Sequence, residues 1–319
     1  MFTWLRFTSF AFTMTLAAFV WPAQVLASCG GAFCSVNTQW ETQGTWTGAG
    51  LRFGLRYEYT DQNQLRSGAD KVAPEGLPGT IDEIRTLNRS LMASFDYAFS
   101  PDWAVSMQLP LIDRVHSHAV NGSVPPVESW NFQSTGDLRL MARRQFGLDE
   151  DSAAGLQFGV KLPTGSIAET NSSGAVAERS LQPGSGTTDA LLGAYYYRKL
   201  EGDATTLFTQ ALWQAPLGER DGYAPGQQVM LDIGLRYSFT LMTSALLQLN
   251  LHWKGRDQGI NAEPDESGGT YVNLSPGVSH LVTPRLQLYG FVQLPLYRYV
   301  NSTQLTADWS VVTGLSWHL

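Results

Sequence analysis

The chain has 319 residues, a formal net charge of −7 at pH 7 and only 15 % charged residues. Its 21 lysines and arginines are spread thinly, which argues against nucleic acid as a partner. Aromatic residues make up 12 % of the chain and glycine occurs 31 times, a composition that is untypical of a disordered chain and favours an all-β protein.

The chain begins with a predicted secretory signal peptide, residues 1–27. Arg6 supplies the positive charge, residues 7–20 form an uncharged apolar run, and residues 25–27 are the small or aliphatic residues found at a signal-peptidase site. The alternative is a transmembrane helix, which needs about 20 apolar residues and a basic flank. The run is too short for that, so we expect the mature chain to leave the cytoplasm.

Residues 28–47 precede the first predicted strand and contain both cysteines, Cys29 and Cys34. An exported segment meets an oxidising compartment, which favours a disulfide, and Gly30-Gly31 provides the backbone freedom to close it. Residues 26–29 also fit a lipobox, so acylation of Cys29 is the main alternative. Metal or redox chemistry is a third possibility, although two thiolates make only half of a tetrahedral zinc site.

From residue 48 onward the chain alternates between apolar and polar residues. In residues 229–240 every odd position is apolar and the even positions are mainly polar, the pattern of a strand between two different environments. The predicted strands are long enough to cross a bilayer when tilted, and their even number fits a bacterial outer-membrane barrel. About twelve are predicted, at 48–60, 85–99, 103–114, 136–147, 154–163, 187–199, 205–215, 227–240, 244–254, 270–282, 285–298 and 304–319.

The connections between these strands alternate in length until the last hairpin, as they do in barrels with short periplasmic turns and long external loops. The long connections are 61–84, 115–135, 164–186, 216–226 and 255–269. The final residues, 313–319, resemble the signal that the barrel-assembly machinery recognises. We therefore predict an all-β, antiparallel transmembrane β-barrel over residues 48–319, in the bacterial outer membrane, with outer-membrane lipid and the assembly machinery as partners.

Three stretches in the middle of the chain resemble one barrel family. They are residues 134–146, which contain Gly-Asp at 136–137, residues 155–165, which end in Lys-Leu-Pro-Thr-Gly, and residues 182–199, which contain Gly-Ser-Gly-x-x-Asp. Their order resembles the MetA-pathway (phenol meta-cleavage) transporter-like family of outer-membrane β-barrels. The resemblance implies transport of a small solute, hydrophobic or aromatic in character, without naming it.

No catalytic motif is present, so we predict no enzymatic activity and no cofactor. A membrane-embedded hydrolase remains a lesser alternative. His116 and His118 fall in a predicted external loop, where ordinary polar loop residues are a better interpretation than metal ligands, and no metal site is predicted. Asp137 and Asp189 each begin a predicted strand, where a carboxylate most often caps a turn.

Strand parity assigns a set of polar and charged side chains to the barrel lumen. These lumen-lining candidates are Arg52, Arg56, Glu58, Asp96, Arg139, Arg143, Lys161, Asp232, Arg236, Gln248, Asn250, His252 and Asp308. Buried charges must be paired or wet, so this set either stabilises a closed barrel or lines a polar path. Eight strands leave room only for side chains and 16–18 leave a water channel, so twelve predict a narrow or plugged pore.

The sequence therefore predicts an outer-membrane barrel through which a small solute diffuses passively. Its gate would be the external loops or the periplasmic segment 28–47, acting as a plug or cap. The alternative from a different class is a structural or assembly barrel that conducts nothing.

Overall fold

The structure is a computed structural model that describes residues 36–38, 49–74, 81–120, 127–200 and 204–319. The predicted signal peptide and both cysteines lie outside the described residues. Within the described ranges, no helix is long and apolar enough to cross a membrane.

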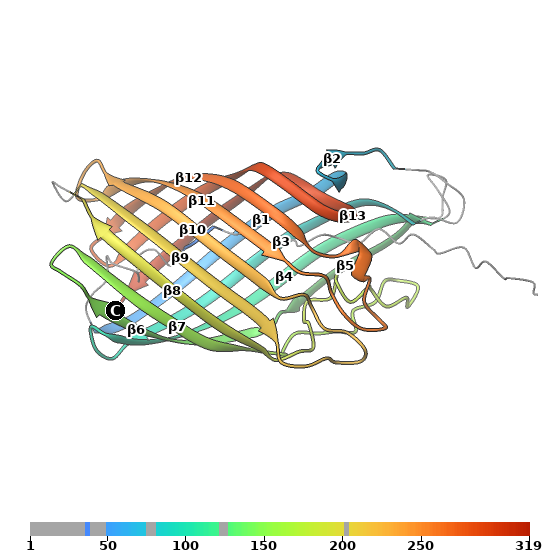
Figure 1. Cartoon of the computed structure of the whole chain (residues 1–319), viewed down its shortest axis with the longest axis horizontal. Helices are drawn as coiled ribbons and strands as arrows, with labels where there is room; N and C mark the ends of the chain where they lie inside the picture. The colour runs from blue at the N-terminus through green and yellow to red at the C-terminus, as the bar shows by residue number, and fades with distance from the viewer. Residues whose placement is uncertain (1–35, 39–48, 75–80, 121–126, 201–203) are drawn as a thin grey trace, which may run out of the picture.

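The described chain forms a closed antiparallel β-barrel of tilted strands (Figure 1). Each strand of the ring pairs with the next one along the chain, and the last strand pairs back with the first. The ring consists of β1 (Gly50–Gly68), β3 (Ile81–Ala98), β4 (Trp103–Val120), β6 (Leu138–Gly147), β7 (Ser152–Leu162), β8 (Asp189–Lys199), β9 (Thr205–Pro216), β10 (Gln228–Ser238), β11 (Thr243–Lys254), β12 (Gly269–Thr283) and β13 (Leu286–His318). Two further strands, β2 (Asp70–Lys71) and β5 (Val127–Thr135), pair with β1 and β4 outside this path.

The long strand β13 crosses the barrel wall twice. Its residues 286–300 pair with β12 and its residues 300–318 pair with β1. The chain reverses near Ser302, whose φ of 53° is a left-handed turn conformation. Because this strand supplies two crossings, the eleven strands of the ring make about the twelve crossings that the sequence predicts.

The barrel has a short-turn end and a long-loop end. The connections 99–102, 148–151, 239–242 and 284–285 lie at the short-turn end, together with the end of β8, the start of β9 and the C-terminus. The connections 163–188, 217–227 and 255–268 lie at the long-loop end, and the last of them contains a short 3-10 helix, η2 (Pro264–Glu266). This asymmetry agrees with the predicted alternation of loop lengths.

The barrel is apolar outside and polar inside, the reverse of a soluble protein. On β10, Leu231 and Ile233 are 37 % and 45 % exposed, whereas Asp232 between them is 4 % exposed. A strand whose apolar side chains face outward and whose polar side chains face a common interior suits a hydrocarbon surround. The period-two pattern of the sequence therefore predicts which face of this strand is buried.

The apolar outer surface ends in a belt of ion pairs towards the long-loop end. On β1 the outward residues are apolar up to Tyr59, and the next outward residue is Asp61, which pairs with Arg85 at 2.7 Å. Arg89 and Asp113 form a second outward pair at 2.9 Å. Strands β1, β3 and β4 continue beyond this belt, so the last residues of β1 and β4 and the first residues of β3 lie outside the apolar band.

The prediction of an external loop over residues 115–135 is wrong, because most of these residues form strands. β4 extends to Val120, and β5 returns alongside it from residue 127. Period-two alternation persists here: His116 and His118 are buried, and so are Trp130 and Phe132 on β5. The predicted loop 61–84 is likewise shortened, because β1 runs to Gly68.

Two apolar clusters fill opposite ends of the interior. The first lies in the short-turn half. It contains Val36 of the N-terminal segment and six residues of the barrel strands: Ala153, Tyr197, Phe208, Leu246, Phe291 and Val312. The second lies under the long loops and consists of Leu65, Trp130, Phe132, Ala177, Leu181 and Leu305. Between them lies the polar part of the lumen.

Candidate functional site

The predicted interior residues nearest the short-turn end are buried or half-buried, and most of them have polar partners on neighbouring strands. Arg52 on β1 and Asp96 on β3 are cross-strand neighbours, and the Arg52 guanidinium donates to the Asp96 carboxylate at 2.8 Å. Both side chains are almost fully buried, as is Arg143 on β6. Arg236 on β10 donates to Ser244 Oγ at 3.1 Å. This part of the predicted set makes contacts that hold the wall together.

A second group forms a buried polar ladder at mid-barrel. Asn250 Nδ2 donates to Asp232 Oδ1 at 2.7 Å and to Gln248 Oε1 at 3.1 Å, and Ser275 Oγ donates to Asn250 Oδ1 at 2.7 Å. These side chains belong to β10, β11 and β12, whose paired register places them side by side. The ladder supplies the polar surface that a chain segment inside the barrel needs.

Residues 36–38 of the N-terminal segment lie inside the barrel against this ladder. The backbone N of Asn37 donates to Gln248 Oε1 at 3.0 Å, and Gln248 Nε2 donates to the Asn37 carbonyl at 2.9 Å. Arg56 donates to Thr38 Oγ1 at 2.6 Å, and Val36 packs in the short-turn apolar cluster. The segment thus occupies the lumen at the boundary between the packed half and the open half.

The third group of predicted residues lines a cavity of about 220 Å³ towards the long-loop end. Arg56, Glu58, Arg139, Lys161 and His252 all contribute to its wall. Asp308 does not belong here: it is 47 % exposed and pairs with Arg298 at 3.1 Å and with Lys71 at 3.4 Å. The structure therefore brings five of the predicted side chains to one cavity and places Asp308 at the rim.

Cationic side chains dominate the wall of this cavity. The cationic residues are Arg56, Arg114, Arg139, Lys161, Arg179 and Lys254, against two acidic ones, Glu58 and Asp137. Behind the wall, Asp189 pairs with Lys161 at 3.0 Å and Asp257 with Lys254 at 2.8 Å, so six cations face four carboxylates. Apolar surface lies between the charges: Met92, Pro110, Ile112, Leu181, Pro183, Pro225 and Met230.

Three loop carboxyls beside this end have pKa values raised well above the usual range of a glutamate. Burial, followed by repulsion from Glu263 and Glu266, raises the pKa of Glu178 to about 8. Burial and the neighbouring carboxylate Asp257 raise the pKa of Glu263 to about 7, and burial and Glu263 raise the pKa of Glu266 to about 8. Their neutral forms leave the cationic character of the long-loop end largely unopposed.

Lys161 is the point where the three family-like stretches meet. Its ammonium lies 3.2 Å from Asp137 and 3.0 Å from Asp189. Asp137 also accepts hydrogen bonds from the backbone N of Gly165 at 3.0 Å and of Ser185 at 2.9 Å. Asp137 is thus a turn cap, as its position predicts, and an ion-pair partner of Lys161, which its position does not predict.

The loops around Lys161 approach each other so closely that only glycine fits. A Cβ on Gly184 would lie 2.3 Å from the carbonyl oxygen of Gly165, and a Cβ on Gly165 would lie 2.6 Å from the Cα of Gly184. These are backbone atoms, which cannot move aside without separating the two loops. The glycines of the family-like stretches therefore fix the long-loop end of the lumen.

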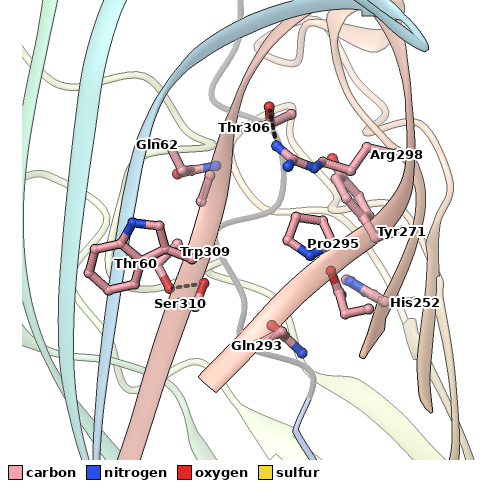
Figure 2. A pocket seen from close by; sticks show the side chains of 12 residues that line it. Thr60, Gln62, His252, Tyr271, Gln293, Pro295, Arg298, Thr306, Trp309 and Ser310 are labelled. Atoms are coloured by element: carbon pink, nitrogen blue, oxygen red, sulfur yellow. Dashed lines mark hydrogen bonds between the residues drawn. The ribbon is translucent and has the colours of Figure 1, made fainter. Parts of the chain in front are cut away.

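A second, much smaller cavity of about 40 Å³ lies where β13 departs from regular pairing (Figure 2). Pro295, which cannot donate to the ladder, sits beside the register shift between β12 and β13. Arg298 donates to Thr306 Oγ1 at 3.1 Å, and Thr60 Oγ donates to Ser310 Oγ at 3.1 Å. This space suits a few water molecules and is too small for an organic solute.

Comparisons with known proteins agree on the fold. No family model matches the sequence, and no curated protein matches it. Among solved structures, the chain is similar to the COG4313 outer membrane channel from Pseudomonas putida F1, with a TM-score of 0.64 and 16 % identity over 85 % of this chain and 96 % of that chain. It is also similar to a mutant of the monoaromatic hydrocarbon channel TodX, with a TM-score of 0.48 and 9 % identity over 92 % of this chain and 96 % of that chain.

The first of these similarities, which covers nearly the whole of that channel, gives the chain the fold of outer-membrane-type β-barrels. At 16 % identity it carries the architecture and no residue roles. Assignment to the phenol meta-cleavage family stays a prediction from the three sequence stretches.

Proposed function

We propose that this protein is a channel of the Gram-negative outer membrane that lets a small solute diffuse passively into the periplasm. Its long loops would face the outside and its short turns the periplasm, as in bacterial barrels generally. The observation that carries the proposal is the cavity at the long-loop end, which is lined in part by loop residues 179–185 and by Arg56, the side chain that also holds Thr38 of the segment inside the lumen. A barrel serving only as a scaffold has no need of either feature.

The lining of the cavity favours a solute that is both apolar and anionic. The six cationic side chains exceed the four neighbouring carboxylates by two, an excess that attracts a carboxylate. The proline, methionine and aliphatic side chains between them suit a ring or a short chain. An aromatic carboxylate combines these features. This narrows the hydrophobic or aromatic solute expected from the sequence to one that carries a negative charge.

The N-terminal segment would act as the gate. Its contacts with Gln248 and Arg56 are a few hydrogen bonds, each worth about 1 kcal/mol net, so that release of the segment is accessible without unfolding the wall. The proposal thus assigns closure to residues 36–38 and solute selection to the cavity beyond them.

Swelling of proteoliposomes tests both parts with solutes of matched size. We expect benzoate to enter faster than benzyl alcohol, and benzyl alcohol faster than benzylamine. Arg139→Gln should reduce the preference for benzoate, because it removes one cation from the cavity wall, whereas the same change at the exposed Arg256 should leave it unaltered.

A barrel that passes none of these solutes, and still passes none after deletion of residues 28–47, is a non-conducting scaffold and contradicts the proposal. Equal entry of benzoate and benzylamine would be consistent with a channel but would contradict the proposed preference for an anionic solute.

A further inference from the structure

Two histidines and a glutamate meet on the inner face of the wall, beyond the outer belt of ion pairs. His116 and His118 are two residues apart on β4, so their side chains point to the same side. Glu83 on β3 is the cross-strand partner of His118, and a register shift between Glu83 and Arg85 brings Thr86 opposite His116. The three side chains are 0–4 % exposed.

The spacing of their donor atoms suits a metal ion. One ligand atom from each of Glu83, His116 and His118 lies within 4.8 Å of the other two. His116 Nε2 is 3.5 Å from Glu83 Oε2. Two donors on a tetrahedral zinc ion lie roughly 3.4 Å apart, given bond lengths of about 2.1 Å. Donor atoms that lie up to 4.8 Å apart would have to approach each other by at most about 1.4 Å to close this set around an ion.

Neighbouring residues orient the rings in the way that metal sites use. His116 Nδ1 is 2.9 Å from Thr86 Oγ1, which leaves Nε2 on the side of Glu83. His118 Nε2 is 3.7 Å from Glu128 Oε2, while its Nδ1 is buried and has no hydrogen-bond partner among the residues that the structure describes. A hydroxyl or carboxylate on one ring nitrogen typically fixes the other nitrogen towards a metal.

The site is walled by an aromatic ring and covered by a long loop. The Trp130 ring lies 5.7 Å from that of His116 and 4.9 Å from that of His118, between ring centres. Trp130 Nε1 donates to the Ala175 carbonyl at 3.0 Å, which ties this wall to the connection 163–188. Low access of water strengthens the attraction between a buried carboxylate and a divalent ion.

We propose that Glu83, His116 and His118 form a binding site for a divalent first-row transition ion such as Zn²⁺. Two imidazole nitrogens and one carboxylate are the ligand set of such ions, whereas Ca²⁺ and Mg²⁺ prefer oxygen alone. The ion would link β3 to β4 beneath the long loops and would stabilise the long-loop end of the barrel.

Binding of Zn²⁺ and Co²⁺ to the folded, chelator-treated full chain tests the proposal. We expect one ion per chain, a visible absorption of bound Co²⁺ that Zn²⁺ abolishes, and no competition from Ca²⁺ or Mg²⁺. Glu83→Gln and His118→Asn should each weaken binding at least about 10-fold, and Thr86→Val should weaken it about 10–100-fold by freeing the His116 ring.

Matched controls separate this site from other ligands of the chain. His280→Gln removes an exposed histidine at the short-turn end that contacts Thr243, and it should not change binding. Cys29→Ser/Cys34→Ser should also retain the ion. Heat-modifiable gel mobility verifies that each variant is folded.

Two results would overturn the proposal. One is a folded wild-type chain that takes up neither Zn²⁺ nor Co²⁺. The other is a folded Glu83→Gln/His118→Asn chain that binds the ion as tightly as the wild type.

Discussion

The two halves of the lumen are built on opposite principles. In the short-turn half the interior is filled: Val36 belongs to an apolar cluster with Tyr197, Phe208 and Phe291, beside the buried Arg52–Asp96 pair. The long-loop half also contains an apolar cluster, but it encloses a cavity of about 220 Å³ whose wall carries more cations than carboxylates. One barrel wall therefore encloses a packed half, which supplies stability and closure, and an open half, which can bind a solute.

This difference explains why the barrel can be plugged without a separate domain. A lumen that is polar throughout would need many hydrogen bonds to hold a segment, whereas an apolar half binds Val36 through burial alone. The cavity of the open half is lined in part by residues of the long loops. The following changes test whether the two halves are independent.

The largest effect is expected in the packed half. Arg52→Met leaves Asp96 buried without its cation and should lower the free energy of unfolding by about 3–5 kcal/mol. The double variant Arg52→Met/Asp96→Leu removes both charges and should recover most of that loss. Urea titration of the barrel in detergent measures both, and a single variant as stable as the double variant would show that the pair is not dry.

The outer surface should respond next most strongly. Leu231→Arg or Ile233→Arg places a charge against hydrocarbon near the middle of β10 and should cost about 2–4 kcal/mol. Asp232→Asn, on the inner face between them, should still assemble. Gel mobility before and after heating compares the three. Equal damage from all three would mean that the two faces of this strand do not differ in environment.

The boundary between the halves should respond through conductance. Gln248→Leu removes both hydrogen bonds to Asn37 and should weaken the seating of residues 36–38 by about 1–3 kcal/mol. We expect larger or more frequent openings in a planar bilayer. Gln287→Leu, a buried glutamine of β13, serves as the matched control. Unchanged conductance in Gln248→Leu would contradict the proposal that the N-terminal segment is the gate.

The smallest effect concerns the open half and leaves the fold intact. Glu178, Glu263 and Glu266 have raised pKa values of about 8, 7 and 8, so they are neutral below that range and ionise above it. Their ionisation adds negative charge beside the cationic cavity. The preference for anions, read from the reversal potential in a salt gradient, should therefore fall as the pH rises from about 6 to about 9. A preference that rises over this range would contradict the protonated state of these carboxyls.

Much of the barrel wall could be predicted from the sequence because the alternation of apolar and polar residues within a strand shows which of its faces is turned outward. Leu231, Asp232 and Ile233 suffice to predict the two faces of β10. The segments in which the alternation is weak have a physical explanation in the packed half: Tyr197 and Phe291 are apolar residues that face inward. There, an apolar residue does not indicate the lipid side.

The sites could be predicted only in part because their residues come from strands that are far apart in the sequence. Lys161 was expected inside the barrel, but its partners Asp137 and Asp189 become visible only once three stretches are folded together. The sequence predicts an external loop at His116 and His118, and Glu83 gives no signal by itself. A cross-strand register is needed to bring them together.

The pairing of the first strand with the last has a consequence for how the newly synthesised chain folds. Arg52 pairs with His318, and Leu319 N donates to the Leu51 carbonyl at 2.9 Å, so the ring closes with contacts between the two ends of nearly the whole described chain. Before the ring closes, the edge of β1 has unpaired backbone groups that can pair with a strand of another chain. Such a contact order makes closure slow and the unfinished sheet prone to aggregate. We therefore expect that the nascent chain needs a chaperone until its last strand can pair with β1. Deletion of the final few residues should lower the yield of folded protein far more than deletion of residues from any loop.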